Sequence, residues 1–150
     1  MTKPADIPFA LDGVPGPRLG ALIDYWRGLL RGEATMPFAD DLDMAEVEAA
    51  VSDAFVLGVF ERPLRFRLDL AATPNATAVG DLAGRFLDEV DLPPALAYVR
   101  SQAEATVESG APTLYRHRTS AGAQRPYARL LLPTWGEGHI KLLVGGIEWR

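Results

Sequence analysis

Cysteine is absent from the 150 residues of this chain. Without thiols the protein forms no disulfide framework, no thiolate zinc site and no iron–sulfur cluster. Nucleophilic catalysis by a cysteine is excluded for the same reason. Any functional site must therefore be built from other side chains.

Lysine is nearly absent as well, with only Lys3 and Lys141, so thirteen arginines supply most of the positive charge. The formal net charge is -5. A surface that binds nucleic acid needs clustered Lys and Arg, because these side chains replace the counterions of the phosphates. We therefore expect no nucleic-acid partner.

Long apolar runs are missing too. No stretch approaches the ~18 apolar residues that cross a bilayer, and the first residues lack the apolar core of a signal peptide. We therefore expect a cytoplasmic protein that does not associate with membranes.

The composition predicts one domain preceded by an arm. Residues 1–16 contain several prolines and glycines, which favour a flexible N-terminal arm. In the whole chain 48% of the residues are hydrophobic, which at this length is enough to enclose one core. The sequence therefore predicts a single domain over residues 17–150.

Apolar spacing predicts three helices. The first begins at Pro17 and the second covers residues 44–51, with Asp43 as its capping residue. A third helix is expected over residues 94–109, where Gly110 suits the left-handed position after a helix. The apolar stripe of the first helix consists of Leu19, Leu22, Ile23, Trp26, Leu29 and Leu30.

Alternating patterns predict a hairpin and a three-stranded meander. The hairpin covers residues 54–61 and 64–70, and the meander covers residues 112–120, 126–134 and 139–148. Brief helical turns are expected over residues 71–93. If Arg129 and Lys141 face outward, the inward side chains of the meander are Ala128, Leu130, Leu132, Ile140, Leu142 and Val144.

The same alternation leaves Leu131 and Leu143 on the outer face of the meander, where they need a cover. The helix over residues 19–30 and a second subunit are the two candidates. We therefore expect Leu22, Trp26, Leu131 and Leu143 to form the interface of a homodimer.

Several segments together resemble a family of short, stand-alone PAS-domain proteins that is common in alphaproteobacteria. The resemblance covers residues 19–147 and depends on the joint order of the segments. They are Tyr25-Trp26 with Leu29, Met36-Pro37, Arg65-Phe66-Arg67-Leu68, Gly80-Asp81-Leu82 with Gly84, Tyr127 with Arg129-Leu130-Leu131-Leu132-Pro133, and Leu142-Leu143-Val144-Gly145-Gly146-Ile147.

The resemblance implies an α+β fold with a PAS-like five-stranded antiparallel sheet, helices on one face and an N-terminal amphipathic helix. It implies a non-catalytic sensory or regulatory module of bacterial signalling that binds a small-molecule ligand, a signalling protein partner, or both. No cofactor is expected. The absence of cysteine excludes a flavin adduct and a thioester-linked chromophore, and the helix over residues 94–109 has no histidine for haem.

Three polar side chains are candidate ligand-binding residues. If Arg116 and Arg118 face solvent, then Tyr115, His117 and Thr119 point inward, as the few polar groups of a ligand pocket do. A solvated histidine on an edge strand is the alternative interpretation of His117.

No catalytic or metal-binding residues are assigned, because capping explains Asp43 and loop solvation explains Asp40 and Asp41. The alternative to a sensor is a small cone-shaped α+β enzyme, similar to isomerases and dehydratases, with a hydrophobic pocket. Such an enzyme needs an inward Asp or His, and His117 is the sequence's candidate.

Overall fold

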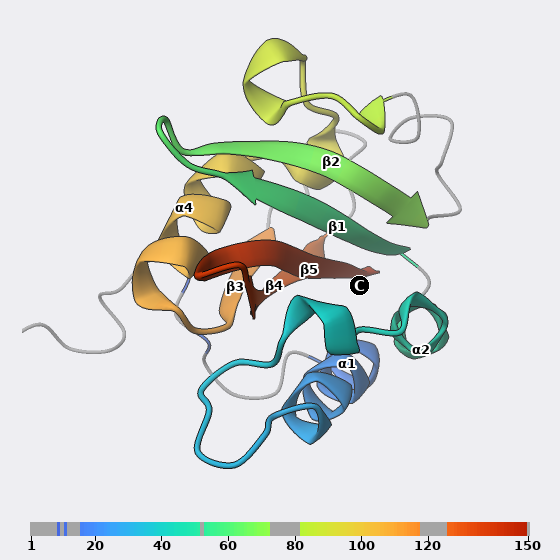
Figure 1. The fold of residues 1–150 in the computed structure, drawn as a ribbon. Coiled ribbons are helices and arrows are strands. Elements are labelled where there is room, and N and C mark those ends of the chain that lie inside the picture. The colour runs from blue at the N-terminus through green and yellow to red at the C-terminus, as the bar shows by residue number, and fades with distance from the viewer. Residues whose placement is uncertain are drawn as a thin grey trace, which may run out of the picture.

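A five-stranded antiparallel sheet forms the centre of the fold within the residues that the computed structural model describes, namely 9, 11, 16–51, 53–72, 82–117 and 126–149. The strand order is β2-β1-β5-β4-β3 (Figure 1). This arrangement confirms the predicted α+β fold class with a PAS-like sheet. The strands are β1 (Asp53–Phe60), β2 (Arg65–Ala72), β3 (Thr113–His117), β4 (Tyr127–Gly136) and β5 (His139–Trp149).

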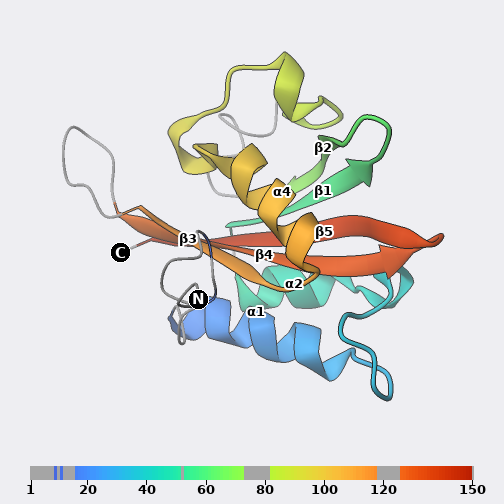
Figure 2. The ribbon, with the colours of Figure 1, turned by 90° about the vertical axis from the view of Figure 1, so that its left-hand side faces the viewer.

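Helices cover both faces of the sheet (Figure 2). The segment between β2 and β3 supplies one layer, which holds α4 (Val99–Ser109) and the short turns η4 (Leu87–Glu89) and η5 (Pro94–Leu96). The opposite face is covered by α1 (Pro17–Gly28) and α2 (Met44–Ala50). The predicted layer on one face is therefore confirmed for the middle segment, while α2 lies with α1 on the other side.

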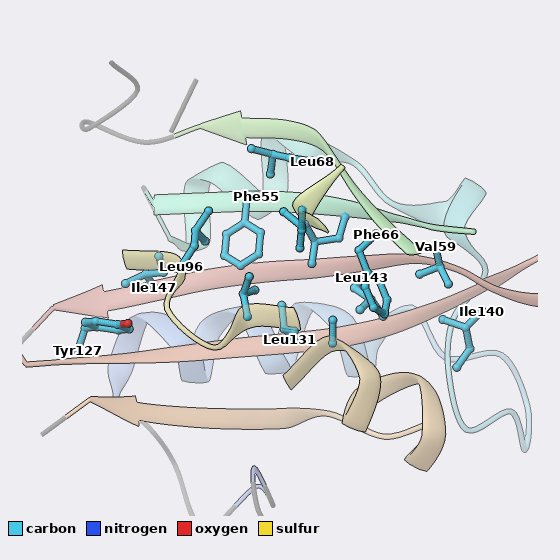
Figure 3. Close-up of a cluster of buried hydrophobic side chains, with 14 residues drawn as sticks. Phe55, Val59, Phe66, Leu68, Leu96, Tyr127, Leu131, Ile140, Leu143 and Ile147 are labelled. Carbon is cyan, nitrogen blue, oxygen red and sulfur yellow. The ribbon is translucent and has the colours of Figure 1, made fainter. Parts of the chain in front are cut away.

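Two hydrophobic cores result from these two layers. Beneath α4, buried apolar side chains of β1, β2, β4 and β5 pack with buried residues of the middle segment. This core includes Phe55, Leu68, Leu96 and Leu143 (Figure 3). Beneath α1 and α2 lies a second core that contains Leu19, Leu22, Trp26, Val47, Ala128, Leu130, Leu132 and Val144. The sheet is thus buried on both faces.

Helix α1 is fixed to the sheet by polar contacts as well as by its apolar stripe. The Glu148 carboxylate accepts hydrogen bonds from the backbone N–H groups of Arg18 (2.8 Å) and Leu19 (3.0 Å), so a strand residue caps this helix. At the other end of the helix, Trp26 Nε1 donates to the Pro133 carbonyl at 2.9 Å. The predicted capping of α2 is also present, since the Asp43 side chain accepts from the Ala45 N–H at 3.0 Å.

The prediction that Arg129 faces outward is wrong. The prediction of which side of the meander faces outward is therefore wrong as well. Arg129 is fully buried and lies on the same face as Leu131 and Leu143, beneath α4. The face of Ala128, Leu130 and Leu132 is the one that α1 covers. A charged residue is an unreliable marker of the solvent side where a helical layer supplies it with hydrogen-bond acceptors.

The predicted single helix over residues 94–109 is interrupted. Residues 94–96 form the short turn η5, and α4 begins at Val99 after Tyr98, which adopts a left-handed conformation with φ 62°. The C-terminal prediction is confirmed, because Gly110 has φ 64°. No helix of the described ranges is long and apolar enough to span a membrane.

Gly145 and Gly146 mark where other elements approach β5 most closely. A Cβ at Gly146 would lie 2.9 Å from Val51 and 3.0 Å from Leu22, and a Cβ at Gly145 would overlap the ring of Phe55. By contrast, a Cβ at Gly28 in α1 meets nothing within 4 Å. Only glycine lets the two layers pack this closely on the central strand.

We therefore predict opposite effects for the same substitution at two positions. Gly145→Ala should lower the free energy of unfolding by about 2 kcal/mol or more, because the buried Phe55 ring has little room to move. Gly28→Ala should raise it by about 0.5 kcal/mol, since alanine reduces the entropy of the unfolded chain without a clash. Urea denaturation followed by circular dichroism measures both, and equal effects would contradict the packing.

Candidate ligand site at one end of the sheet

The strand register brings seven side chains together at the end of the sheet where β5 finishes. One row across the strands contains Asp53, Ile147, Arg129 and Tyr115, because these residues are Cα partners on β1, β5, β4 and β3. The next row contains Trp149, Tyr127 and His117. We call these the inner row and the end row.

Arg129 is the centre of the site and is 0% exposed. Its Nε donates to Gln102 Oε1 at 2.9 Å, its Nη1 to the Ala95 carbonyl at 3.0 Å and its Nη2 to the Ala97 carbonyl at 2.8 Å. Ala95 lies in η5, and Ala97 lies between η5 and α4. The interruption thus supplies acceptors that a continuous helix would have used internally.

Gln102 joins the arginine to the edge strand. Its Nε2 donates to the Arg129 carbonyl (3.0 Å) and to both the carbonyl (3.1 Å) and the hydroxyl (3.2 Å) of Thr113. The Thr113 hydroxyl also lies 2.6 Å from the hydroxyl of Thr106. These four residues form a buried polar network that ties α4 to β3 and β4.

The charge of Arg129 has only neutral hydrogen-bond partners among the described residues. Burial lowers the pKa of the guanidinium to about 10, because desolvation penalises the charged form. Burial also raises the pKa of the neighbouring Tyr127 above its usual 10.0, although the positive charge of Arg129 opposes this rise. The lowered pKa of Arg129 and the raised pKa of Tyr127 both indicate that this end of the sheet is poorly solvated.

Aromatic rings line the site around the arginine. The guanidinium lies 4.8 Å from the ring centroid of Tyr115, and that ring lies 6.0 Å from Tyr127 and 5.9 Å from Tyr98. Tyr98 is 67% exposed and so borders the site toward solvent. The Tyr127 hydroxyl donates to the Pro94 carbonyl at 2.9 Å, which adds a second link between β4 and the interruption.

Of the three predicted ligand-binding residues, the structure places two at this site. Tyr115 is half-buried and packs against the core beneath α4. His117 is half-buried and its ring stacks on Tyr127 at 5.1 Å, while its Nε2 is buried and makes no hydrogen bond. Thr119 lies outside the described residues.

The four predicted interface residues are not brought together. Leu22 and Trp26 lie beneath α1 on one face of the sheet, whereas Leu131 and Leu143 lie beneath α4 on the other. All four are at most 4% exposed within a single chain. The prediction that they form one surface patch is corrected, because the two helical layers already cover both sets.

Sequence reasoning missed Arg129, Gln102 and Asp53. Asp53 is buried on β1, and its carboxylate accepts a hydrogen bond from Trp149 Nε1. The available signal was the series Tyr127, Arg129 and Leu131, in which an arginine alternates in phase with large apolar side chains. Trp149 packs at the end of the sheet, where its ring lies 5.2 Å from that of Tyr127.

The geometry does not favour acid–base chemistry at this site. Asp53 and His117 are separated by three strand spacings of ~4.8 Å, or about 14 Å, which is far beyond hydrogen-bond reach. Among the described residues no group of three His, Cys, Asp or Glu side chains could hold a metal ion. The polar groups at this end of the sheet are instead a buried guanidinium and a buried imidazole nitrogen, Nε2 of His117, that makes no hydrogen bond.

Three solved structures resemble the chain in fold. A sensory box sensor histidine kinase from Vibrio cholerae aligns with 11% identity over 71% of this chain and 88% of its own, with a TM-score of 0.49. A light-oxygen-voltage domain studied with a flavin analogue aligns with 16% identity over 75% and 87%, with a TM-score of 0.48. A fungal LOV domain photoreceptor aligns with 17% identity over 88% and 90%, with a TM-score of 0.46. No protein-family model matches the sequence, and no curated protein does so either.

Arg129→Lys tests the central contact. A lysine keeps the charge but cannot reach three acceptors that lie in different directions, so the carbonyls of Ala95 and Ala97 lose their partners. We expect the free energy of unfolding to fall by about 2 to 4 kcal/mol. The same replacement at the exposed Arg27 should change it by less than about 0.5 kcal/mol. Similar values for both variants would contradict the role of Arg129.

Tyr127 provides a pH-dependent test. Because its folded pKa is raised, the stabilising contribution of the neutral phenol is complete below about pH 10 and is lost as the pH rises through the folded value. An ultraviolet titration of the wild type minus Tyr127→Phe should therefore show a phenol with a pKa above 10. A phenol that titrates below its usual pKa would contradict the burial of this site.

Proposed function

We propose that this protein is a sensory module of the PAS type that has no catalytic activity of its own. In this proposal it binds a small molecule at the end of the sheet that carries the inner row and the end row, and it passes the resulting change to a signalling protein partner. The observation that carries the proposal is the burial of Arg129, whose charge is held by neutral oxygens beside a wall of aromatic rings. A buried charge of this kind is expensive to maintain, which supports a role beyond stability.

The chemistry of the side chains favours a small, ring-bearing ligand with at least one hydrogen-bonding group. A ligand ring can pack against the exposed Tyr98 and the half-buried Tyr115, whose ring centroids lie 5.9 Å apart. His117 Nε2 is buried without a partner and is available to hydrogen-bond such a ligand. Tyr115 and His117 are therefore the proposed binding residues, as the sequence analysis expected.

The interruption before α4 is the proposed switching element. A ligand group that accepts a hydrogen bond from Arg129 competes with the carbonyls of Ala95 and Ala97 for the same guanidinium. Loss of these bonds removes the contacts that hold Tyr98 in its left-handed conformation. Ligand binding beside Arg129 is thereby coupled to the start of α4.

The wider context of the proposal follows the sequence resemblance. We place the chain with the short PAS-domain proteins of alphaproteobacteria, acting in the cytoplasm, without a cofactor and as a homodimer. The division into an arm over residues 1–16 and a domain over residues 17–150 is kept in this proposal. The arm contacts the domain, since the Phe9 carbonyl accepts from the Leu114 N–H at 2.9 Å and Leu11 packs on the core beneath α1.

The test compares native and denaturing mass spectra of the purified protein with two matched variants. We expect the wild type to carry extra mass that is lost on denaturation. His117→Gln should reduce the bound fraction severalfold, because it removes the stacked ring and the buried Nε2. His139→Gln should retain the ligand, since His139 lies at the far end of β5.

Two outcomes would count against the ligand site. Equal retention by both histidine variants would place the ligand elsewhere. A wild type that carries no extra mass, and whose melting temperature is unchanged by a library of small aromatic acids and amides, would argue that the module acts through protein contacts alone.

A further inference from the structure

A solvent-filled hollow lies at the opposite end of the sheet from the end row, beside the turn between β4 and β5. This turn projects from the body of the molecule at the end of the sheet remote from the C-terminus (Figure 2). The hollow has a volume of about 350 Å³. Its lining consists of Arg31, Phe38, Asp40, Asp41, Trp135, Gly136 and Glu137.

Backbone contacts hold the walls of the hollow in place. The Trp135 N–H donates to the Pro37 carbonyl at 2.9 Å, and Phe38 and Trp135 form an isolated parallel bridge. Pro37 and Ala39 on either side of Phe38 are both buried. The chain between α1 and α2 is therefore anchored on β4, and Phe38 and Trp135 have fixed positions.

Both aromatic side chains of the hollow are exposed. Phe38 is 47% exposed and Trp135 is 39% exposed, although β4 is buried from Tyr127 to Thr134. An arginine of the chain already uses one of these rings, since the Arg31 guanidinium lies 5.7 Å from the centroid of Phe38. Exposed aromatic rings beside a fixed hollow are typical of a surface that binds another molecule.

The rim of the hollow has an excess of negative charge. Arg31 is engaged by Asp41 in a two-bond ion pair at 2.7 and 2.9 Å. Lys141 Nζ lies 3.4 Å from Glu137 and reaches only one of its oxygens at the limit of a contact. Asp40 is exposed and has no ion pair among the described residues. A guanidinium binds carboxylates by charge-assisted hydrogen bonds and aromatic faces by cation–π contacts, and this rim offers both groups.

We propose that this hollow docks an arginine side chain from an exposed segment of a partner protein. The guanidinium stacks on Trp135, the better of the two rings for a cation, and donates hydrogen bonds to Asp40 and Glu137. Because the chain itself has a net charge of -5, a basic partner is more complementary to this rim than a second copy is. The inference rests on the part of the proposed function in which the module acts on a protein partner.

The probe is a seven-residue neutral-ended peptide with one central arginine, flanked by glycine, serine and alanine. Its matched control carries citrulline, which keeps the shape and removes the charge. Both are titrated into the full-length, isotope-labelled protein while the indole N–H of Trp135 is followed by NMR. We expect saturable shifts with the arginine peptide at millimolar concentration and none with the citrulline peptide.

Variants locate the contacts. Trp135→Leu should abolish the binding, and because this variant has no indole at position 135, the backbone amide signals of Phe38 and Glu137 are followed instead. The double variant Asp40→Asn with Glu137→Gln should weaken the binding about tenfold, because it removes both charge-assisted contacts of the guanidinium. Asp24→Asn, which removes an exposed carboxylate from α1, should leave the affinity unchanged. The spectrum of residues far from the hollow serves as the check that each variant is folded.

Three outcomes would overturn the inference. The first is an unshifted Trp135 signal at millimolar arginine peptide, and the second is equal binding of the citrulline peptide. The third is a change of the Trp135 signal with protein concentration alone, which would assign the hollow to a second copy of this chain. The ligand test is separate, because it measures mass lost on denaturation and not the Trp135 signal, so one proposal can fail without the other.

Discussion

The contact on which the rest of this structure depends is the burial of the Arg129 guanidinium beneath α4. Its donors hold the carbonyls of Ala95 and Ala97 and the amide oxygen of Gln102, so one side chain joins the centre of the sheet to the helical layer above it. These oxygens are available because the chain is interrupted between η5 and α4. The interruption and the buried charge therefore require each other, since each leaves polar groups unsatisfied without the other.

The site follows from this contact. Because Arg129 faces α4, its alternate neighbour Tyr127 lies on the same face, and the register then adds Tyr115 and His117 from β3 and Trp149 from β5. The rings screen the charge from water, and the charge gives an otherwise apolar corner a strong hydrogen-bond donor. In the proposed function, Arg129 contacts the ligand and also holds the chain at the start of α4, so one residue serves both recognition and response.

The two ends of the sheet divide the proposed tasks between them. At one end, Tyr98 and Tyr115 form a pair of rings beside the buried Arg129, where the proposed small molecule binds. At the other end, the turn after β4 presents Trp135 and Glu137 beside Phe38 and Asp40, as suits a protein segment. β4 contributes to both, since it pairs with β5 from Tyr127 to Gly136 and with β3 from Tyr127 to Leu131. A displacement of this strand is therefore the simplest mechanical link between the sites.

The order of the elements, the apolar stripe of α1 and the cap at Asp43 follow from the amino-acid sequence, because they depend on local spacing. Which face of the meander lies beneath which helices depends instead on packing between segments far apart in the chain. Alternation divides β4 into two sets of residues but does not show which helices cover each set. The outward prediction for Arg129 is wrong because two of its acceptors lie 32 and 34 residues away in the chain. Hydrogen bonds over that distance exist only once the helical layer has packed on the sheet, and so the site around Arg129 could not be derived from the pattern of the strand.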